Sequence, residues 1–171
     1  MGTNSIKKFE EEVLFTKDDI EYIKSFFNGW EISSVYNGNE SSKDFNFRKC
    51  FTSYKSKNNE LINFVVKKLH SFGVQSISDG IQLLKYEEGH YFRAHRDNST
   101  DKFRWRFKSL VTQLSKSSEY EGGELLIKGR PIKKQLGNTV MFDSIDSHEV
   151  LELTKGTRYT MVAWLTKDDI I

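Results

Sequence analysis

Residues 81–97 read IQLLKYEEGHYFRAHRD, and the expected fold follows from the pattern of this stretch. It opens on an apolar run, Ile81–Tyr86, with the length and composition of a buried strand. Gly89 then supplies a turn, and aromatic residues lead on to His95 and Asp97. These two residues are two apart, so on an extended segment both side chains point to one face. The stretch therefore predicts a strand and a turn, followed by a pair of candidate metal ligands.

The chain beyond Gly80 consists of short strand-like runs separated by glycine-rich or charged turns. After Ile81–Tyr86, the expected strands are Phe103–Leu114, Gly123–Ile127, Ile132–Gln135, Thr139–Phe142, Val150–Leu153 and Arg158–Leu165. Short strands at such regular spacing are typical of a β-sandwich or barrel. We therefore expect a catalytic β core over about 80–167.

The N-terminal part, about 1–79, predicts two helices that support this core. Thr16 is expected to cap a first helix that ends at Asn28-Gly29. A second helix is expected over about 59–72, before Gly73. Two further strands and a polar, mobile loop are expected between the helices: Trp30–Tyr36, Phe47–Ser53 and the connecting loop Asn37–Asp44.

Composition indicates one globular domain, residues 1–171. That length fits a single domain, and 37% hydrophobic with 13% aromatic residues suffice for a core. Cys50 is the only cysteine, which excludes an internal disulfide and fits a reducing compartment. Met1–Glu12 lacks the apolar segment of a secretory signal, and no stretch reaches the ~18 apolar residues of a membrane span. We expect a cytoplasmic protein; its net charge of +2 neither demands nor excludes nucleic acid.

His95 and Asp97 would need a third ligand to form a site of two histidines and one carboxylate. Such a set occupies one face of an octahedron and leaves positions open for substrate and oxygen. His148 is the only downstream histidine and is therefore preferred. His90 is the alternative, but its spacing from His95 puts the two on one face of neither helix nor strand. His70, near a helix end, is expected to interact with the helix dipole. From spacing alone, three unconnected loop residues are an equal alternative.

Residues 102–108 read KFRWRFK and alternate cations with aromatic side chains. On a strand the aromatic residues would share a face with Ser109, Val111 and Gln113, which we expect to be the barrel interior. Interleaved basic and aromatic residues can also indicate a nucleic-acid surface. We favour an ordinary strand with a solvated charged face, so nucleic acid is a partner that the sequence allows without favouring it.

In their order along the chain, these motifs resemble the 2-oxoglutarate- and Fe(II)-dependent dioxygenase superfamily, in its prolyl 4-hydroxylase-like branch. The resemblance covers roughly 82–165, nearly half of the chain. The matching residues are Tyr86, Gly89, Phe92, His95, Asp97, Arg106, Ser109, Leu114, Gly122–Leu125, His148–Val150, Gly156, Arg158 and Trp164. The resemblance implies a mainly β (α+β) fold, with a double-stranded β-helix core (the jelly-roll or cupin-like form) and the N-terminal helices packed on one sheet.

The resemblance also assigns roles to individual residues. The Fe(II) ligands would be His95, Asp97 and His148. Arg158 would hold the far carboxylate of 2-oxoglutarate, because arginine is permanently charged and matches a carboxylate geometrically. Tyr86 would add a hydroxyl to the co-substrate pocket, and Gln113, where the family often has a tyrosine, would add a hydrogen bond. The remaining residues expected around the pocket are Trp164, Ser109, Val111 and Asn98.

Arg158 begins the strand expected to close the core. If it faces inward, it shares its face with Thr160, Val162 and Trp164. A charge inside a barrel is costly unless it is paired, and the ligand carboxylate would be its partner. Spacing alone makes a surface arginine equally acceptable; the resemblance favours the ligand.

The implied reaction consumes O2 and converts 2-oxoglutarate to succinate and CO2 while a substrate C–H bond is hydroxylated, with ascorbate as a candidate accessory. Asp97 argues against halogenation, because related halogenating enzymes lack this carboxylate. The expected substrate is a prolyl or other peptidyl residue, with the loop Asn37–Asp44 as a candidate lid. The alternatives are a free amino acid or other small metabolite, a nucleic acid, and a catalytically silent jelly-roll binding module.

Overall fold

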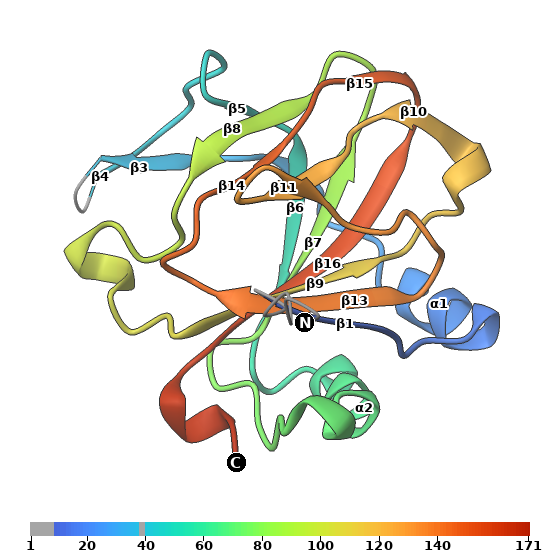
Figure 1. Ribbon diagram of the computed structural model, residues 1–171, viewed down its shortest axis with the longest axis vertical. Helices are drawn as coiled ribbons and strands as arrows, with labels where there is room; N and C mark the ends of the chain where they lie inside the picture. The colour runs from blue at the N-terminus through green and yellow to red at the C-terminus, as the bar shows by residue number, and fades with distance from the viewer. Residues whose placement is uncertain (1–8, 38–39) are drawn as a thin grey trace, which may run out of the picture.

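The computed structural model describes residues 9–37 and 40–171 as two facing antiparallel sheets with helices on one side (Figure 1). Over these residues the larger sheet has seven strands, in the order β1 (Glu10–Val13), β13 (Asn138–Asp143), β9 (Lys108–Gln113), β16 (Arg158–Leu165), β7 (Ile81–Tyr86), β6 (Phe51–Lys55) and β2 (Glu31–Ile32). The smaller sheet has five, in the order β12 (Arg130–Pro131), β11 (Leu125–Ile127), β14 (His148–Val150), β8 (Tyr91–His95) and β5 (Arg48–Lys49). Two strand pairs extend the ends of this sandwich: β3 (Val35–Asn37) with β4 (Glu40–Ser42), and β10 (Tyr120–Gly122) with β15 (Leu153–Gly156).

The larger sheet is covered on both faces because apolar residues occupy both sides of its strands. On β7, Leu83 belongs to the core beneath the helices, whereas its neighbour Leu84 belongs to the core between the sheets. Met161 and Val162 divide in the same way on β16. Side chains of successive strand residues point to opposite faces, so these runs serve two cores at once. The predicted mainly β fold is confirmed.

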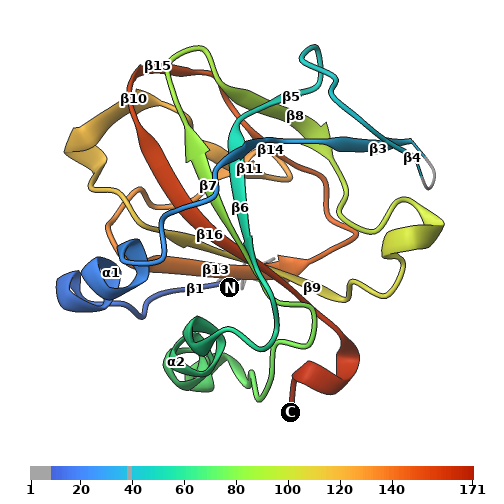
Figure 2. The same cartoon turned by 180° about the vertical axis from the view of Figure 1, so that it is seen from behind.

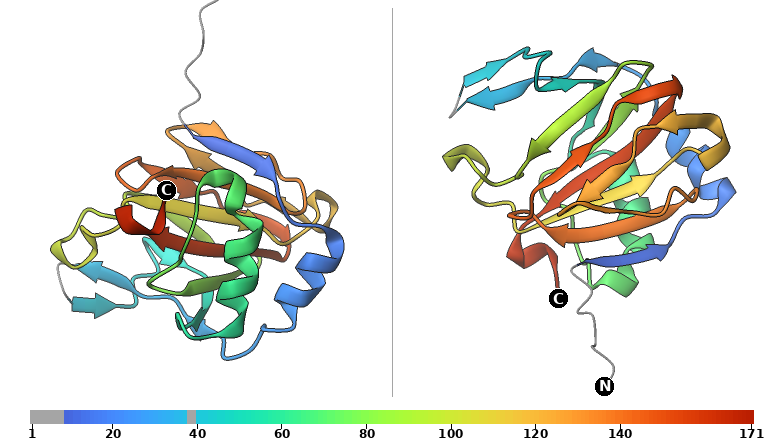
Figure 3. Two further views of the ribbon diagram at one scale, coloured as in Figure 1. Left: turned by 90° about the horizontal axis from the view of Figure 1, so that it is seen from below. Right: turned by 45° about the horizontal axis from the view of Figure 1, so that its top comes forward.

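Helices cover the outer face of the larger sheet, as Figures 2 and 3 show. Helix α1 (Lys17–Lys24) begins at Thr16, whose hydroxyl accepts a hydrogen bond from the Asp19 amide while the Asp19 carboxylate accepts one from the Thr16 amide. Helix α2 (Glu60–Lys68) begins at Asn59. Both predicted helices are confirmed, and a short 3-10 turn then runs from His70 to Phe72. None of the helices in the described part of the chain is long and apolar enough to cross a membrane.

The two strands expected between the helices are each divided in the structure. Trp30–Tyr36 contains β2 and the start of β3, and Phe47–Ser53 contains β5 and the start of β6. The break at Cys50, which is fully buried, carries the chain from one sheet to the other, since β5 pairs with β8 and β6 pairs with β7. The expected loop Asn37–Asp44 contains β4, and its residues 38 and 39 lie outside the described part of the chain.

The expectation of a strand over Phe103–Leu114 is wrong for its first part. The strand starts only at Lys108; a 3-10 turn, Asp101–Phe103, and a further turn precede it. The Arg106 guanidinium lies 3.8 Å from the ring centroid of Phe103 and 3.7 Å from that of Trp164. This stacking folds the segment across the end of the sheet, and Trp105 is consequently exposed rather than inside the barrel.

The expected strand Ile132–Gln135 is also absent, because the pairing with β11 ends at Pro131 and the chain then turns. The expected strand Val150–Leu153 is the junction of β14 and β15. By contrast, Ile81–Tyr86 and Arg158–Leu165 have the predicted bounds as β7 and β16. The proposed division into 1–79 and 80–167 stays a prediction.

Asp169 connects the C-terminal segment to the loop that follows α2. Its fully buried carboxylate accepts hydrogen bonds from the hydroxyls of Ser76 and Ser78 and from the Thr166 amide. Burial raises the pKa of Asp169, but these hydrogen bonds outweigh burial and hold the pKa below its ordinary value. The ionised carboxylate therefore stabilises the folded state.

We predict that Asp169→Asn lowers the free energy of unfolding by about 1–3 kcal/mol at neutral pH, because donors that now face a carboxylate lose a charged acceptor. A carboxyl group whose pKa is lowered on folding stabilises above its unfolded pKa, and this contribution is lost as the pH falls through the folded value. The difference between the wild-type protein and the variant should therefore shrink in acid. Urea unfolding at several pH values measures it, and a difference independent of pH would contradict the prediction.

Candidate active site

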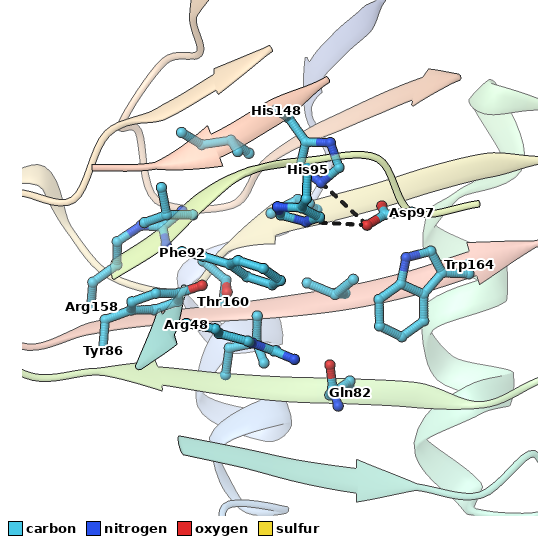
Figure 4. A pocket seen from close by; sticks show the side chains of 15 residues that line it. Arg48, Gln82, Tyr86, Phe92, His95, Asp97, His148, Arg158, Thr160 and Trp164 are labelled. Carbon is cyan, nitrogen blue, oxygen red and sulfur yellow. Dashed lines mark ion pairs between the residues drawn. The ribbon is translucent and has the colours of Figure 1, made fainter. Parts of the chain in front are cut away.

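A pocket lies between the two sheets and is lined by residues of both (Figure 4). The register of β16 on β7 places Arg158 opposite Tyr86, and two further pairs follow on the same face: Thr160 with Leu84 and Val162 with Gln82. All six side chains line the pocket, as does Trp164. The predicted common face of Arg158, Thr160, Val162 and Trp164 is therefore present, and it faces the pocket.

The smaller sheet brings the three candidate metal ligands together. His95 at the end of β8 is the register partner of His148 at the start of β14. Asp97 follows in the turn after β8, where its amide donates a hydrogen bond to the Ser144 carbonyl at 3.0 Å. One ligand atom from each of the three lies within 4.8 Å of the others. The turn, rather than a continued strand as the sequence suggested, puts Asp97 beside the histidines.

Hydrogen bonds to backbone carbonyls orient both imidazoles. His95 Nδ1 lies 2.7 Å from the Arg93 carbonyl oxygen, and His148 Nδ1 lies 3.0 Å from that of Asp146. A carbonyl only accepts, so each Nδ1 donates and each Nε2 is left as the ligand nitrogen in the neutral ring. The two Nε2 atoms face Asp97 Oδ1 at 3.3 and 3.4 Å. Three ligand atoms aimed at one point are what a divalent cation requires.

The charges of the three residues support the same interpretation. Burial raises the pKa of Asp97, but the adjacent histidines outweigh burial and hold the pKa well below its usual value. Burial lowers the pKa of His95. Burial also lowers the pKa of His148, but the Asp97 and Asp146 carboxylates outweigh it and raise the pKa above its ordinary value. Asp97 is thus ionised, and a cation that binds here competes with a proton on His148.

Neighbouring polar residues fix the Asp97 side chain. The Ser109 hydroxyl donates to Asp97 Oδ2 at 2.6 Å and lies 2.9 Å from the Ser144 hydroxyl. Arg106 Nη1 donates to the Asp97 carbonyl at 3.2 Å. Asn98, which was expected at the pocket, does not line it. Its side-chain amide nitrogen lies 3.5 Å from the Arg106 carbonyl oxygen. Ser109 therefore acts on the site through Asp97 and leaves Oδ1 directed at the histidines.

Arg158 lies at the other end of the pocket and is buried without an ion pair in the described part of the chain, although the Glu124 carboxylate is close enough to interact with it electrostatically. Only 1% of its surface is exposed, and its Nε and Nη1 atoms have no hydrogen-bond partner among the described residues. The Tyr86 hydroxyl and the Thr160 hydroxyl are likewise buried and unpartnered there. Burial raises the pKa of Tyr86, so its hydroxyl stays neutral and can donate. Buried donors around an unpaired guanidinium fit the carboxylate of a ligand.

The other expected residues occupy different places. Val111 lines the pocket, whereas Gln113 is buried on the same strand and does not line it, so a contact of Gln113 with a co-substrate stays a prediction. His90 lies apart from the three ligands, and its Nδ1 accepts the Glu87 amide at 3.0 Å. His70 is exposed in the 3-10 turn after α2.

The sequence assigned no role in the pocket to Phe92 or Arg48, although Phe92 is one of the residues that carry the resemblance. The Phe92 ring stacks on His95, with ring centroids 3.7 Å apart and planes inclined by 10°. Arg48, on β5, also lines the pocket. Its strand leaves one sheet for the other at Cys50, so alternation along the expected strand Phe47–Ser53 could not assign its face.

Comparisons with known proteins agree with this geometry. The family model described as the 2OG-Fe(II) oxygenase superfamily matches residues 81–166. A PKHD-type hydroxylase of Prochlorococcus marinus is 32% identical over 113 residues, which are 63% of this chain and 51% of that protein. One from Acinetobacter baumannii is 34% identical over 98 residues, covering 50% and 43%. The chain thus spans about half the length of the curated relatives it matches.

Solved structures share the fold. A prolyl-4-hydroxylase of Pseudomonas putida superposes with a TM-score of 0.72 at 14% identity, covering 94% of this chain and 93% of that chain. The viral collagen prolyl hydroxylase of Paramecium Bursaria Chlorella virus-1, in complex with 2OG, gives a TM-score of 0.65 at 17% identity, covering 95% and 98%. The predicted double-stranded β-helix core is thereby confirmed.

We predict that His148→Ala weakens binding of a divalent cation by more than the roughly 100-fold that loss of a supporting residue can cost. The fold should persist, because His148 sits at the start of a short strand and not in either apolar core. Calorimetric titration with Mn(II), which resists oxidation better than Fe(II), measures the affinity. His90→Ala is the matched control and should bind Mn(II) as the wild type does; wild-type affinity in the His148 variant would show that the ligand set is wrong.

Proposed function

The chain belongs to the 2OG-Fe(II) oxygenase superfamily, and we propose that it is an Fe(II)- and 2-oxoglutarate-dependent dioxygenase that hydroxylates a C–H bond of a prolyl or other peptidyl residue. The reaction consumes O2 and releases succinate and CO2, with ascorbate as an accessory reductant. One observation carries the proposal: a three-ligand cation site and an unpaired buried arginine occupy opposite ends of one pocket.

The cation end would hold Fe(II) through His95 Nε2, His148 Nε2 and Asp97. Three protein ligands leave other positions of an octahedral ion for co-substrate and oxygen. Iron bound there with 2-oxoglutarate supplies the oxidising chemistry. The protein's own contribution is orientation: carbonyls fix both imidazoles, and Ser109 fixes the carboxylate. Asp97 occupies the position that a halide would need, which favours hydroxylation.

The arginine end would hold the remote carboxylate of 2-oxoglutarate. Arg158 presents its Nε and Nη1 donors, and the hydroxyls of Tyr86 and Thr160 lie beside it in the pocket. Apolar side chains line the space between the two ends, among them Leu125 and Val150. They keep water away from the reacting groups, and the fixed donors orient the co-substrate toward the metal ligands.

The choice of a peptidyl substrate rests on the relatives. Curated relatives are named PKHD-type hydroxylases, and one similar solved structure is a prolyl hydroxylase of Trichoplax adhaerens in complex with a peptide fragment of hypoxia inducible factor. A groove beside the pocket offers room for a chain segment next to the metal ligands. We also place the enzyme in the cytoplasm, where the free, buried Cys50 would stay reduced.

The proposal is tested by succinate release from the iron-loaded protein. Proline-containing peptides, free amino acids and oligonucleotides are offered in parallel with 2-oxoglutarate in air, and products are identified by mass spectrometry. Peptides should stimulate succinate formation and gain one oxygen atom. Stimulation of succinate release by amino acids or by oligonucleotides alone would identify the substrate as a member of that class. Binding of 2-oxoglutarate without turnover under any condition would indicate a catalytically silent binding module.

We predict that Arg158→Leu weakens 2-oxoglutarate binding by about 30-fold or more, because the co-substrate carboxylate loses a buried charged partner. Anaerobic titration of the Fe(II)-loaded protein, followed by the visible charge-transfer band, measures this affinity. Metal binding should be unchanged, since Arg158 contacts none of the three ligands in the described structure. Arg130→Leu, on an exposed edge strand, is the control. Equal affinity in the Arg158 variant and the wild type would refute the assignment.

A further inference from the structure

A second guanidinium enters the pocket from the smaller sheet. Figure 4 shows Arg48 extending toward Gln82 and away from Arg158. Its carbon Cζ lies 4.4 Å from the Phe92 ring centroid, and Phe92 in turn stacks on His95 at 3.7 Å. Arg48 is therefore held one aromatic ring away from a metal ligand, on the side where the pocket meets the groove.

One edge of this guanidinium is free for a ligand. Nη1 donates to the Ser34 carbonyl at 3.1 Å, whereas Nε is buried and has no partner among residues 9–37 and 40–171. No carboxylate within that part of the chain forms an ion pair with Arg48. Nε and Nη2 of an arginine together form the edge that donates to both oxygens of a carboxylate. Ser34 takes Nη1, and no hydrogen bond within the described part of the chain occupies that edge.

The groove next to Arg48 is lined by charges of both signs, with one more cation than carboxylates. The cations are Lys43, Arg48, Arg96 and Arg106, and the carboxylates are Glu31, Asp79 and Asp97. A groove with an excess of one charge concentrates ligands of the opposite sign.

We propose that Arg48 determines substrate specificity by binding a carboxylate of the substrate close to the carbon that reacts. This inference rests on the proposed function, and it narrows the substrate to an acidic one. The carboxylate belongs either to the free carboxyl end of the substrate or to an acidic side chain next to the target residue. A phosphate chain fits less well, because nucleic-acid backbones are bound by many exposed cations rather than by one planar edge.

The direct test uses the Zn(II)-loaded, diamagnetic protein saturated with 2-oxoglutarate, so that Arg158 is already occupied. The Arg48 Nε–Hε resonance, assigned through its own backbone, is followed by NMR during titration with matched probes. One pair is N-acetyl-L-proline and its amide; the other is Ac-Ala-Pro-Asp-Gly-NH2 and its Asn counterpart. A saturable shift with the carboxylate member of either pair, and not with its amide, supports the proposal and identifies the source. No shift with any probe, or an equal shift with inorganic phosphate, overturns it.

A kinetic test examines the same contact in the iron-loaded enzyme. The carboxylate member of a pair should have kcat/KM at least tenfold above its amide in the wild type, and Arg48→Leu should abolish that preference by lowering kcat/KM far more for the carboxylate member than for the amide. Arg48→Lys, which keeps the charge but not the edge, should recover only part of it. Arg93→Leu is the matched control, since Arg93 lies on the adjacent strand β8, is exposed and lines neither cavity.

Failure of this inference differs from failure of the proposed function. If the iron-loaded protein consumes no 2-oxoglutarate with any probe and none binds to it, the proposed function is refuted. If 2-oxoglutarate binds and is consumed, but carboxylate and amide probes are equal in the wild type, only the role of Arg48 is refuted. Equal losses for both members of a pair in Arg48→Leu would likewise assign Arg48 a structural role.

Discussion

A permanent positive charge buried between the two sheets imposes the main constraint on this domain. Arg158 begins the strand β16, is only 1% exposed, and forms no ion pair with a carboxylate in the described chain. An unpaired buried charge is costly, so the sheets must supply enough apolar packing to hold it in place. They do this with two cores that share one sheet, one beneath the helices and one around the pocket. The stability of the helical side thus offsets the cost of a buried charge on the other side.

The two ends of the pocket are built on different principles. At the proposed metal end, each candidate ligand has a second partner that fixes its orientation: a carbonyl for each imidazole and a serine hydroxyl for the carboxylate. At the arginine end, the donors are aimed inward and left unsatisfied. The first arrangement fixes the orientation of the side chains before anything binds, and the second leaves polar donors available to a bound ligand. Strand pairing positions the residues of both ends, because His95 lies opposite His148 in the smaller sheet and Arg158 lies opposite Tyr86 in the larger sheet.

The sequence allowed a prediction of the candidate site residues that can be recognised from residue type and from order along the chain. His95, Asp97 and His148 could be proposed because only one histidine lies downstream, and the inward face of β16 followed from alternation along an uninterrupted strand. It failed where tertiary contacts override local pattern. The alternating segment at 102–108 is not a strand, since Arg106 stacks between Phe103 and Trp164. Arg48 was missed because a strand that changes sheets has no single face to predict.

That change of sheets at Cys50 has a mechanical result. One continuous segment belongs to both sheets of the sandwich: β5 pairs with β8 in the smaller sheet, and β6 pairs with β7 in the larger sheet. Separation of the two sheets at this point is therefore unfavourable, because it would break backbone hydrogen bonds on both sides of the fully buried Cys50. The groove beside the pocket is lined by Ser34, Val35 and Lys43, so a molecule that enters the interior along it passes the β3 and β4 strands.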